Sequence, residues 1–179
     1  MTVNLATGTG SGGDAGGDIL SNFENIIGSS FSDIITGDAG FNIIEGLGGA
    51  DSLDGGGGND TISYIFSPTG VNVNLSSGIG MSGDAEGDII SNISNIIGSP
   101  YSDILTGDFH SNSIQGGDGN DIICGMGGND TLLDGGNGND TITYEYCSVG
   151  VYVTLGLNKS TWPDGSTDFL LNFENIKGS

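Results

Sequence analysis

Positive charge is nearly missing from this sequence of 179 residues, which contains two lysines, no arginine and one histidine against 23 acidic residues. Nucleic acids and anionic membranes bind proteins through clustered lysine and arginine. A chain with a formal net charge of -21 therefore excludes both as partners. Long apolar runs are missing too, so no segment reaches the roughly 20 residues of a transmembrane helix and we expect no membrane insertion.

Catalytic and zinc-type residues are equally scarce. Cys124 and Cys147 lack zinc-ligand spacing, and they form one disulfide at most or remain two free thiols, the alternative that we favour. His110 lies in a polar stretch without a serine or cysteine arranged for activation, so we expect an exposed loop residue. Residues 1–20 lack the basic and apolar regions of a signal peptide. We therefore expect that these residues do not form an enzyme.

Glycine, by contrast, is abundant, with 36 copies, and much of it recurs in a pattern. Residues 28–63 divide into GSSFSDIIT, GDAGFNIIE, GLGGADSLD and GGGGNDTIS. Residues 98–143 divide into GSPYSDILT, GDFHSNSIQ, GGDGNDIIC, GMGGNDTLLD and GGNGNDTIT, of which the fourth has ten residues. Each repeat opens on Gly and carries Asp or Asn at the sixth place and Ile or Leu at the eighth.

This period fits neither an α-helix nor a simple alternating strand. It predicts six residues of tight loop followed by a three-residue strand that turns one apolar side chain inward. Two repeats then complete one flattened coil, and the loops of alternate repeats stack about 4.8 Å apart. The predicted fold is all-β: a parallel β-roll or β-helix solenoid with stacked loops rich in Gly and Asp.

The stacking predicts columns of acidic side chains along both edges of the solenoid. One edge combines sixth-place acids with acids that precede the repeats: Asp14, Asp33 and Asp51, then Asp84, Asp103, Asp121 and Asp140. The other edge holds Glu24, Asn42 and Asp60, then Ser94, Asn112 and Asp130. Carboxylates at strand spacing repel each other, and a cation between them removes the repulsion.

Calcium suits such loops best, because it accepts six to eight hard oxygen ligands from carboxylates and backbone carbonyls in loose geometry. Magnesium demands a strict octahedron, and zinc prefers the His and Cys ligands that are scarce here. Asn42 and Asn112 lack charge and are weaker ligands. Burial of one or two apolar side chains per repeat does not clearly offset the ordering of nine glycine-rich residues. We therefore expect folding to depend on several bound Ca²⁺ ions.

The pattern resembles G-G-x-G-x-D-x-U-x, the RTX (haemolysin-type) calcium-binding nonapeptide repeat, where U is a large apolar residue. The resemblance implies a parallel β-roll that folds on calcium after type I secretion, and hence an extracellular or cell-surface location. The carboxylate ligands that it implies are Asp33, Asp51, Asp60, Asp103, Asp121, Asp130 and Asp140. Loop glycines would add backbone carbonyls, and we single out Gly46, Gly48, Gly55, Gly57, Gly116, Gly119, Gly125, Gly127, Gly135 and Gly138.

A longer repeat also runs through the chain, because residues 1–29, 71–99 and 151–179 align at offsets of 70 and 80. The parts of these stretches that precede Gly28, Gly98 and Gly178 are here named the first, second and third spacers. They predict three units: residues 1–70 with four nonapeptides, residues 71–150 with five, and a partial unit at residues 151–179. Neither end of the predicted solenoid carries a protecting cap, so we expect stacking on adjoining repeats of a longer chain or on head-to-tail copies.

Two functions remain open at this stage. The first is a structural module, stiffened by Ca²⁺, in a secreted adhesin, surface-layer protein or filament. The second is a calcium-binding accessory or secretion region of a secreted lipase, protease or alginate epimerase whose catalytic domain lies outside these residues. We favour the structural function, because no catalytic signature accompanies the repeats.

Overall fold

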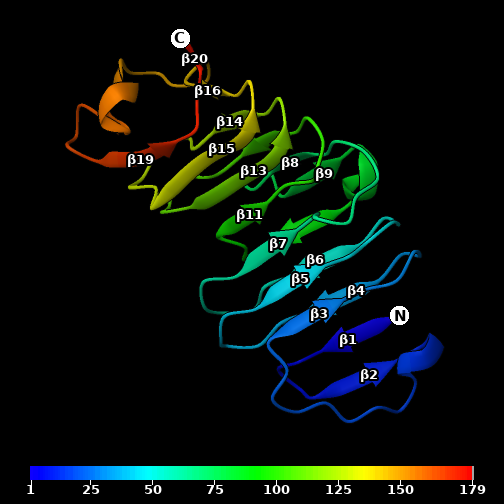
Figure 1. The fold of residues 1–179 in the computed structure, drawn as a ribbon. Helices are drawn as coiled ribbons and strands as arrows, with labels where there is room; N and C mark the ends of the chain where they lie inside the picture. The colour runs from blue at the N-terminus through cyan, green and yellow to red at the C-terminus, as the bar shows by residue number, and fades with distance from the viewer. Residues whose placement is uncertain (179) are drawn as a thin grey trace.

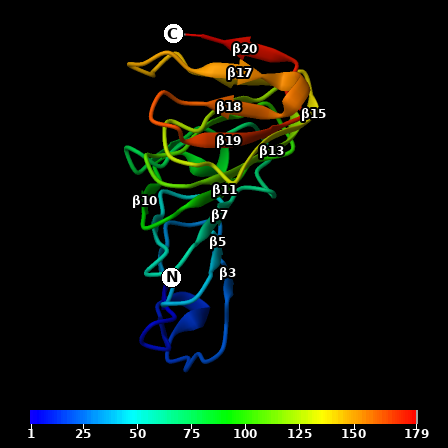
Figure 2. The ribbon, with the colours of Figure 1, turned by 90° about the vertical axis from the view of Figure 1, so that its left-hand side faces the viewer.

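The computed structural model describes residues 1–178 as a stack of short strands in two facing sheets (Figures 1 and 2). The first sheet has 11 strands in the order β2 (Thr9–Ser11), β1 (Thr2–Asn4), β4 (Ile34–Thr36), β6 (Ser52–Asp54), β10 (Ile89–Ser91), β9 (Ile79–Met81), β8 (Asn72–Asn74), β12 (Ile104–Thr106), β14 (Ile122–Cys124), β16 (Thr141–Thr143) and β20 (Asn175–Lys177). The second has nine strands in the order β17 (Tyr152–Thr154), β18 (Lys159–Thr161), β19 (Thr167–Leu171), β15 (Leu132–Gly138), β13 (Ser113–Gly119), β11 (Asn95–Ile97), β7 (Thr61–Ser63), β5 (Ile43–Glu45) and β3 (Asn25–Ile27).

Successive nonapeptides lie alternately in the two sheets, so each strand pairs in parallel with a strand two repeats away. Ile35 of β4 is in register with Leu53 of β6, and Ile44 of β5 is in register with Ile62 of β7. Each of these steps is 18 residues, as two nonapeptides per coil require. The predicted all-β parallel roll is confirmed. Within residues 1–178, no helix is long and apolar enough to cross a membrane.

The core between the sheets is built from one apolar side chain per repeat. Each of the following inward residues has no exposed surface: Ile35, Ile44, Leu53, Ile62, Leu105, Ile114, Ile123, Leu133 and Ile142. All but one occupy the eighth place of a nonapeptide. The exception is the ten-residue repeat, where the pairing of Ile114 with Leu133 places the extra residue ahead of the strand and turns the ninth residue inward.

The spacers interrupt the parallel stack with antiparallel strands. In the second spacer, β8 pairs with β9 and β9 with β10, while the short helix η2 (Gly83–Ala85) lies between β9 and β10 in the chain. The first spacer contains the corresponding short helix η1 (Gly13–Ala15), whereas the short helix η3 (Leu155–Leu157) of the third spacer lies earlier, between β17 and β18. The outer strands β10 and β8 pair in parallel with β6 and β12, so the second spacer lies within the 11-stranded sheet.

The antiparallel strands of the third spacer lie in the nine-stranded sheet, and its last strand, β20, lies in the 11-stranded sheet. Its strand β19 pairs with β15 of the nine-stranded sheet, and β18 and β17 follow outward. Successive repeats alternate between the two sheets. Four nonapeptides precede the second spacer and five precede the third, so the antiparallel strands of the third spacer begin in the sheet opposite to those of the second. Cys124, which is buried, and Cys147 are free thiols.

Candidate metal centres

The sixth-place side chains face inward, where each has at most 2% of its surface exposed. One carboxylate oxygen of each stacked Asp accepts a hydrogen bond from the backbone amide of the sixth-place residue one coil earlier. The amide of Asp33 donates to Oδ1 of Asp51 at 2.8 Å, and that of Asn42 donates to Oδ1 of Asp60 at 2.7 Å. Corresponding bonds link Asp103 to Asp121, Asn112 to Asp130 and Asp121 to Asp140. The Asp side chains of each column are therefore held in place by hydrogen bonds from the backbone of the preceding coil.

The second carboxylate oxygen divides the nine loops into two kinds. In five loops no donor among residues 1–178 reaches the buried Oδ2 atom, and we call these the open loops. They end at Asp51, Asp60, Asp121, Asp130 and Asp140. The other four loops, which we call closed, end at Asp33, Asn42, Asp103 and Asn112. An unpartnered buried carboxylate oxygen costs several kcal/mol, on the order of the loss of a hydrogen bond to a charged group.

In the closed loops the second-place residue supplies the missing donor. The amide of Ser99 donates to Oδ2 of Asp103 at 2.6 Å, and its hydroxyl donates to Oδ1 at 2.7 Å. Ser29 makes the equivalent bonds to Asp33. In the two Asn loops the amides of Asp38 and Asp108 donate to Oδ1 of Asn42 and Asn112. These loops are satisfied by protein donors alone.

Backbone conformation separates the two kinds in the same way. In all five open loops the second and fourth places have positive φ, for example 106° at Gly117 and 129° at Gly119. In the closed loops, all of which lie among the described residues, neither place does. Leu47 and Met126 adopt the same left-handed conformation at second places, with φ of 63° and 71°. In two of the open loops the second-place amide bonds to a different carboxylate, since Gly56 donates to Asp54 and Gly136 donates to Asp134.

Backbone carbonyls approach the free carboxylate oxygens where a glycine leaves room. At Gly116, a Cβ atom would meet both Oδ2 of Asp121 and, at 2.6 Å, the carbonyl oxygen of Gly135 in the next coil. The carbonyl oxygens of Gly46 and Gly116 approach Gly28 and Gly98 in the closed loops of Asp33 and Asp103, where the carboxylates are already bonded to serine. The first-place glycine therefore leaves space into which a carboxylate and a carbonyl of successive coils both point.

The spacers provide the carbonyl where no further repeat follows. Beside Oδ2 of Asp60 lies the carbonyl oxygen of Asn92, and beside Oδ2 of Asp140 lies that of Asn172. Both Asn residues have a φ of 54°, and each donates its side-chain amide at 2.7 Å to the Asp that ends the preceding repeat, Asp54 or Asp134. The second and third spacers therefore each place a backbone carbonyl oxygen beside the free carboxylate oxygen of the open loop that precedes them in the chain.

Burial changes the acidity of these groups. It raises the pKa of Asp121 to about 7, with smaller contributions from the neighbouring carboxylates of Asp103 and Asp140. It also raises the pKa of Asp130 to about 8 and that of Asp51 to about 6. Without a cation, protonation relieves part of the cost of burying these carboxylates. A divalent cation would stabilise the charged form instead.

The donor set fits a hard cation that accepts neutral oxygens. Among the residues described, no three His, Cys, Asp or Glu side chains gather closely enough to hold a metal ion by themselves. Any ion at the open loops therefore takes several ligands from backbone carbonyls, as calcium does and zinc does not. The third-place amides of Gly57 and Gly127 bond to the carbonyls of Asp38 and Asp108 one coil earlier, so they connect two of the open loops to the neighbouring coil.

Asp14 and Asp84 were expected in the acidic columns, and that placement is wrong. Asp84 lies in η2, and the carboxylate that accepts the amide of Asp51 at 2.9 Å belongs to Asp88. Oδ1 of Asp103 accepts a hydrogen bond from the backbone amide of Val71, and Oδ1 of Asp33 accepts one from the N-terminal ammonium group. These two donors occupy the column positions at which Asp84 and Asp14 were expected.

Sequence reasoning missed Asp88 and its counterpart Asp168, although a signal was present. Residues 83–91, GDAEGDIIS, fit the nonapeptide pattern with Asp88 at the sixth place and Ile90 at the eighth. These spacer acids are satisfied by the protein, since the hydroxyl of Tyr64 donates to Asp88 at 2.9 Å. In the third spacer, Nε1 of Trp162 donates to Asp168, also at 2.9 Å.

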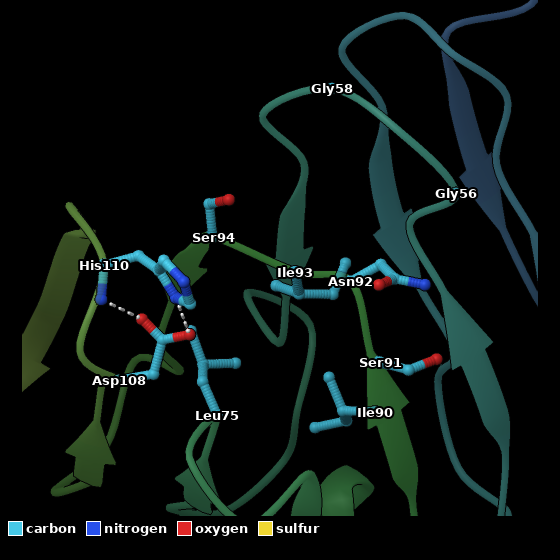
Figure 3. Close-up of a pocket in the computed structure, with 10 residues that line it drawn as sticks. All are labelled: Gly56, Gly58, Leu75, Ile90, Ser91, Asn92, Ile93, Ser94, Asp108 and His110. Carbon is cyan, nitrogen blue, oxygen red and sulfur yellow. Dashed lines mark hydrogen bonds and ion pairs between the residues drawn. The ribbon is translucent and has the colours of Figure 1, made fainter.

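A hollow of about 290 Å³ opens beside the second spacer, between the loops that carry Gly58 and His110 (Figure 3). His110 is exposed, and its Nδ1 lies 2.9 Å from Oδ2 of Asp108, which raises the pKa of the imidazole. Both side chains stand at the rim, with the apolar Ile90 and Ile93 nearby (Figure 3). The hollow contains none of the free carboxylate oxygens.

Fold and loops together define a parallel β-roll whose edge loops present paired carboxylate and carbonyl oxygens. Residues 27–62, 97–132 and 133–144 match the family model of the RTX calcium-binding nonapeptide repeat, in four copies. The chain carries RTX repeats, and repeats of this family bind calcium ions. No curated protein matches the chain significantly.

Proposed function

We propose that this protein is an extracellular structural β-solenoid module that folds and stiffens when its open loops bind Ca²⁺. The observation that carries the proposal is the set of five buried Oδ2 atoms for which the described chain provides no donor. A folded protein rarely leaves so many buried polar atoms unpaired, because each carries a desolvation cost. Calcium removes that cost and also reduces the repulsion within each column.

The open loops supply the ligands in this proposal. Oδ2 of Asp51, Asp60, Asp121, Asp130 and Asp140 would bind Ca²⁺ directly, with the carbonyl of Gly135 assisting Asp121. The carbonyls of Asn92 and Asn172 would assist Asp60 and Asp140. The closed loops at Asp33 and Asp103 would contribute backbone carbonyls more than carboxylates, because their oxygens are already bonded to Ser29 and Ser99. Asp14 and Asp84 lie outside the columns, and we assign them no ion.

A secreted rod is the context that we propose for the module, as a segment of an adhesin, surface-layer protein or filament. Three features support it: the stack is elongated (Figure 2), the chain is strongly acidic, and RTX repeats occur in secreted proteins. Loops of this kind suit a medium rich in calcium, since extracellular modules bind Ca²⁺ with Kd values of roughly 0.1 to 1 mM. Such sites would remain empty in a calcium-poor compartment, so export would precede folding.

A calcium titration followed by circular dichroism tests this function. The chain should be largely disordered in excess chelator at pH 7.5 and become β-rich in millimolar Ca²⁺. A site with a Kd near 0.1 mM adds about 1.4 kcal/mol to the free energy of unfolding at about 1 mM Ca²⁺. Magnesium at the same concentration is the matched control and should produce little change. A β-rich spectrum that is identical with and without chelator would contradict the proposal.

A further inference from the structure

The stretch that leads into the second spacer and the stretch that leads into the third spacer have almost the same sequence. Residues 53–64 read LDGGGGNDTISY and residues 133–144 read LDGGNGNDTITY, so ten of twelve positions are identical. No other repeat in the sequence is followed directly by Tyr. This twelve-residue stretch is here named the junction coil, because in both places it packs against the spacer that follows.

Both junctions use the same hydrogen bonds. At the second spacer, Nδ2 of Asn92 donates to Asp54 at 2.7 Å and Nδ2 of Asn95 donates to Oδ1 of Asn59 at 2.8 Å. The amide of the junction Tyr donates to the carbonyl of Ile97 at 2.9 Å. The third spacer repeats all three bonds, with the pairs Asn172–Asp134, Asn175–Asn139 and Tyr144–Lys177. These contacts are therefore a reproducible interface within one molecule.

The first spacer carries the same groups on an uncovered face. Asn22 aligns with Asn92 and Asn172 and has the same left-handed backbone, with a φ of 57°. Asn22, Asn25 and Ile27 are all exposed. Phe23 is 53% exposed, whereas its counterpart Ile93 is 7% exposed beneath the junction coil of residues 53–64.

A hollow of about 330 Å³ lies in this uncovered face, lined mainly by apolar side chains that include Val3, Leu20, Phe23 and Ile26. Asp18 lies at the same hollow and is exposed. Its counterpart Asp88 is fully buried and accepts hydrogen bonds from the amide of Asp51 and the hydroxyl of Tyr64. The face thus has the apolar floor, the carboxylate and the two Asn side chains of a junction interface.

We infer that the uncovered face of the first spacer binds one more RTX coil with the junction sequence L-D-G-G-x-G-N-D-T-I-x-Y. Asn22 would donate to the first Asp of that coil, Asn25 to the Asn that directly precedes its second Asp, and the carbonyl of Ile27 would accept the amide of its Tyr. The open loop of the docked coil would then receive the carbonyl of Asn22, as Asp60 receives that of Asn92. This inference rests on the calcium-dependent fold proposed above and names the partner of the uncovered face of the first spacer.

A second copy of this chain does not supply that coil. Its two junction coils, residues 53–64 and 133–144, are already covered by its own second and third spacers. The opposite end of the stack presents the spacer strands β17 and β20, which lack the junction sequence. The occupant is therefore a nonapeptide coil from outside these residues.

An extended protein tests the inference. Residues 28–70 are joined ahead of Met1, which reproduces the natural connection between Gly70 and Val71. Hydrogen exchange of residues 18–27 is then compared between the extended and the original protein in millimolar Ca²⁺. We expect exchange to slow at least tenfold in the extended protein. Replacing Asp54→Ala and Asn59→Ala in the added copy alone should reverse most of that protection.

The outcomes separate the docking face from the calcium-dependent fold. Circular dichroism first establishes that both proteins become β-rich in calcium. With folding established, unchanged exchange of residues 18–27 overturns the inference and leaves the proposed function standing. Protection that is already present in the original protein at high concentration, and that disappears on dilution, also overturns it, because the occupant would then be a second copy.

Discussion

The backbone amide of Asp121 donates a 2.8 Å hydrogen bond to Oδ1 of Asp140, 19 residues later in the chain. Asp121 in turn accepts the amide of Asp103, so its carboxylate stands in the middle of a column. Both Asp121 and Asp140 belong to open loops, and no other pair of open loops stacks directly in the described chain. The strongest calcium site is therefore expected between these two loops.

Replacing Asp121 should weaken calcium binding more than replacing a residue at either end of a column. We expect Asp121→Ala to raise the calcium midpoint of folding severalfold, because its carboxylate faces the coils on both sides. Asp33→Ala and Asp140→Ala should have smaller effects, since each lies next to the end of its column. Calcium titrations followed by circular dichroism measure all three midpoints. Equal shifts at the three positions would contradict the stacking of the columns.

The fourth-place glycines of open loops should not tolerate a side chain. Gly128 has a φ of 108°, and a Cβ atom there would meet the backbone carbonyl of His110. We expect Gly128→Ala to lower the free energy of unfolding in calcium by about 1 to 3 kcal/mol, because left-handed backbone disfavours alanine and the backbone neighbour cannot move aside.

Gly40→Ala is the matched control for this substitution. Gly40 occupies the fourth place of a closed loop without positive φ, and its nearest obstacle is the flexible side chain of Asp38 at 3.1 Å. The control should change the unfolding free energy by less than about 1 kcal/mol. Urea denaturation in millimolar Ca²⁺ compares the two variants. Similar losses for both would show that the two kinds of loop do not differ as described.

Tyr64 should stabilise the junction with the second spacer through its hydroxyl group. The hydroxyl donates to the fully buried carboxylate of Asp88 at 2.9 Å. We expect Tyr64→Phe to cost about 1.5 to 3 kcal/mol, because it leaves a buried carboxylate oxygen without a donor. Tyr146→Phe is the control, since Tyr146 is 69% exposed. Thermal melts in calcium test the pair, and an unchanged melting temperature for Tyr64→Phe would rule out this role.

The calcium-free fold should be most stable in acid. The pKa values of Asp51, Asp121 and Asp130 are raised to about 6, about 7 and about 8, all above the ordinary value of an unfolded Asp near 3.9. A raised pKa means that the folded chain binds more protons than the unfolded chain. The stability gained by protonation is therefore fully present below about pH 4 and is lost as the pH rises through about 6 to 8.

Circular dichroism of metal-free protein at pH 4, 6 and 8 measures this trend. The β signal should decline with rising pH, and millimolar Ca²⁺ should restore it at pH 8, where the carboxylates are ionised. Asp130→Asn should flatten the upper part of the profile, because it removes the group with the highest of the three pKa values. Metal-free structure that increases from pH 4 to pH 8 would contradict the assignment.

Much of the fold follows from the sequence because one rule applies at every repeat. The sixth and eighth places of a nonapeptide are two residues apart, so both face inward, as Asp121 and Ile123 do. The ten-residue repeat departs from the rule at a single point, where one extra residue ahead of the strand makes Leu133 the inward residue. The eighth-place rule selects Leu132 in this repeat, and the pairing with Ile114 shows that Leu133 is the inward residue instead.

The sites were less predictable, because spacing alone does not describe a loop. A separation of 19 residues made Asp84 and Asp103 look like neighbours in one column, yet the antiparallel strands of the spacer separate them. The residue that defines the column is the one two places before the buried Ile90, which is Asp88. The division into open and closed loops also depends on backbone φ at the second place, where Leu47 gave no sequence signal for a left-handed residue.

The placement of the spacers determines the direction in which such a rod curves. Between β6 and β12 the 11-stranded sheet advances by four strand steps, while the facing sheet advances by two from β7 to β13. The side that holds a spacer is therefore longer by roughly 10 Å at about 4.8 Å per step, and the axis bends toward the opposite side. Blocks with an even number of repeats place successive bends on one side and wind the rod into an arc. Odd blocks, such as the five repeats before β17, alternate the bends and keep the long axis straight on average. The count of nonapeptides between spacers thus encodes the path of the solenoid axis.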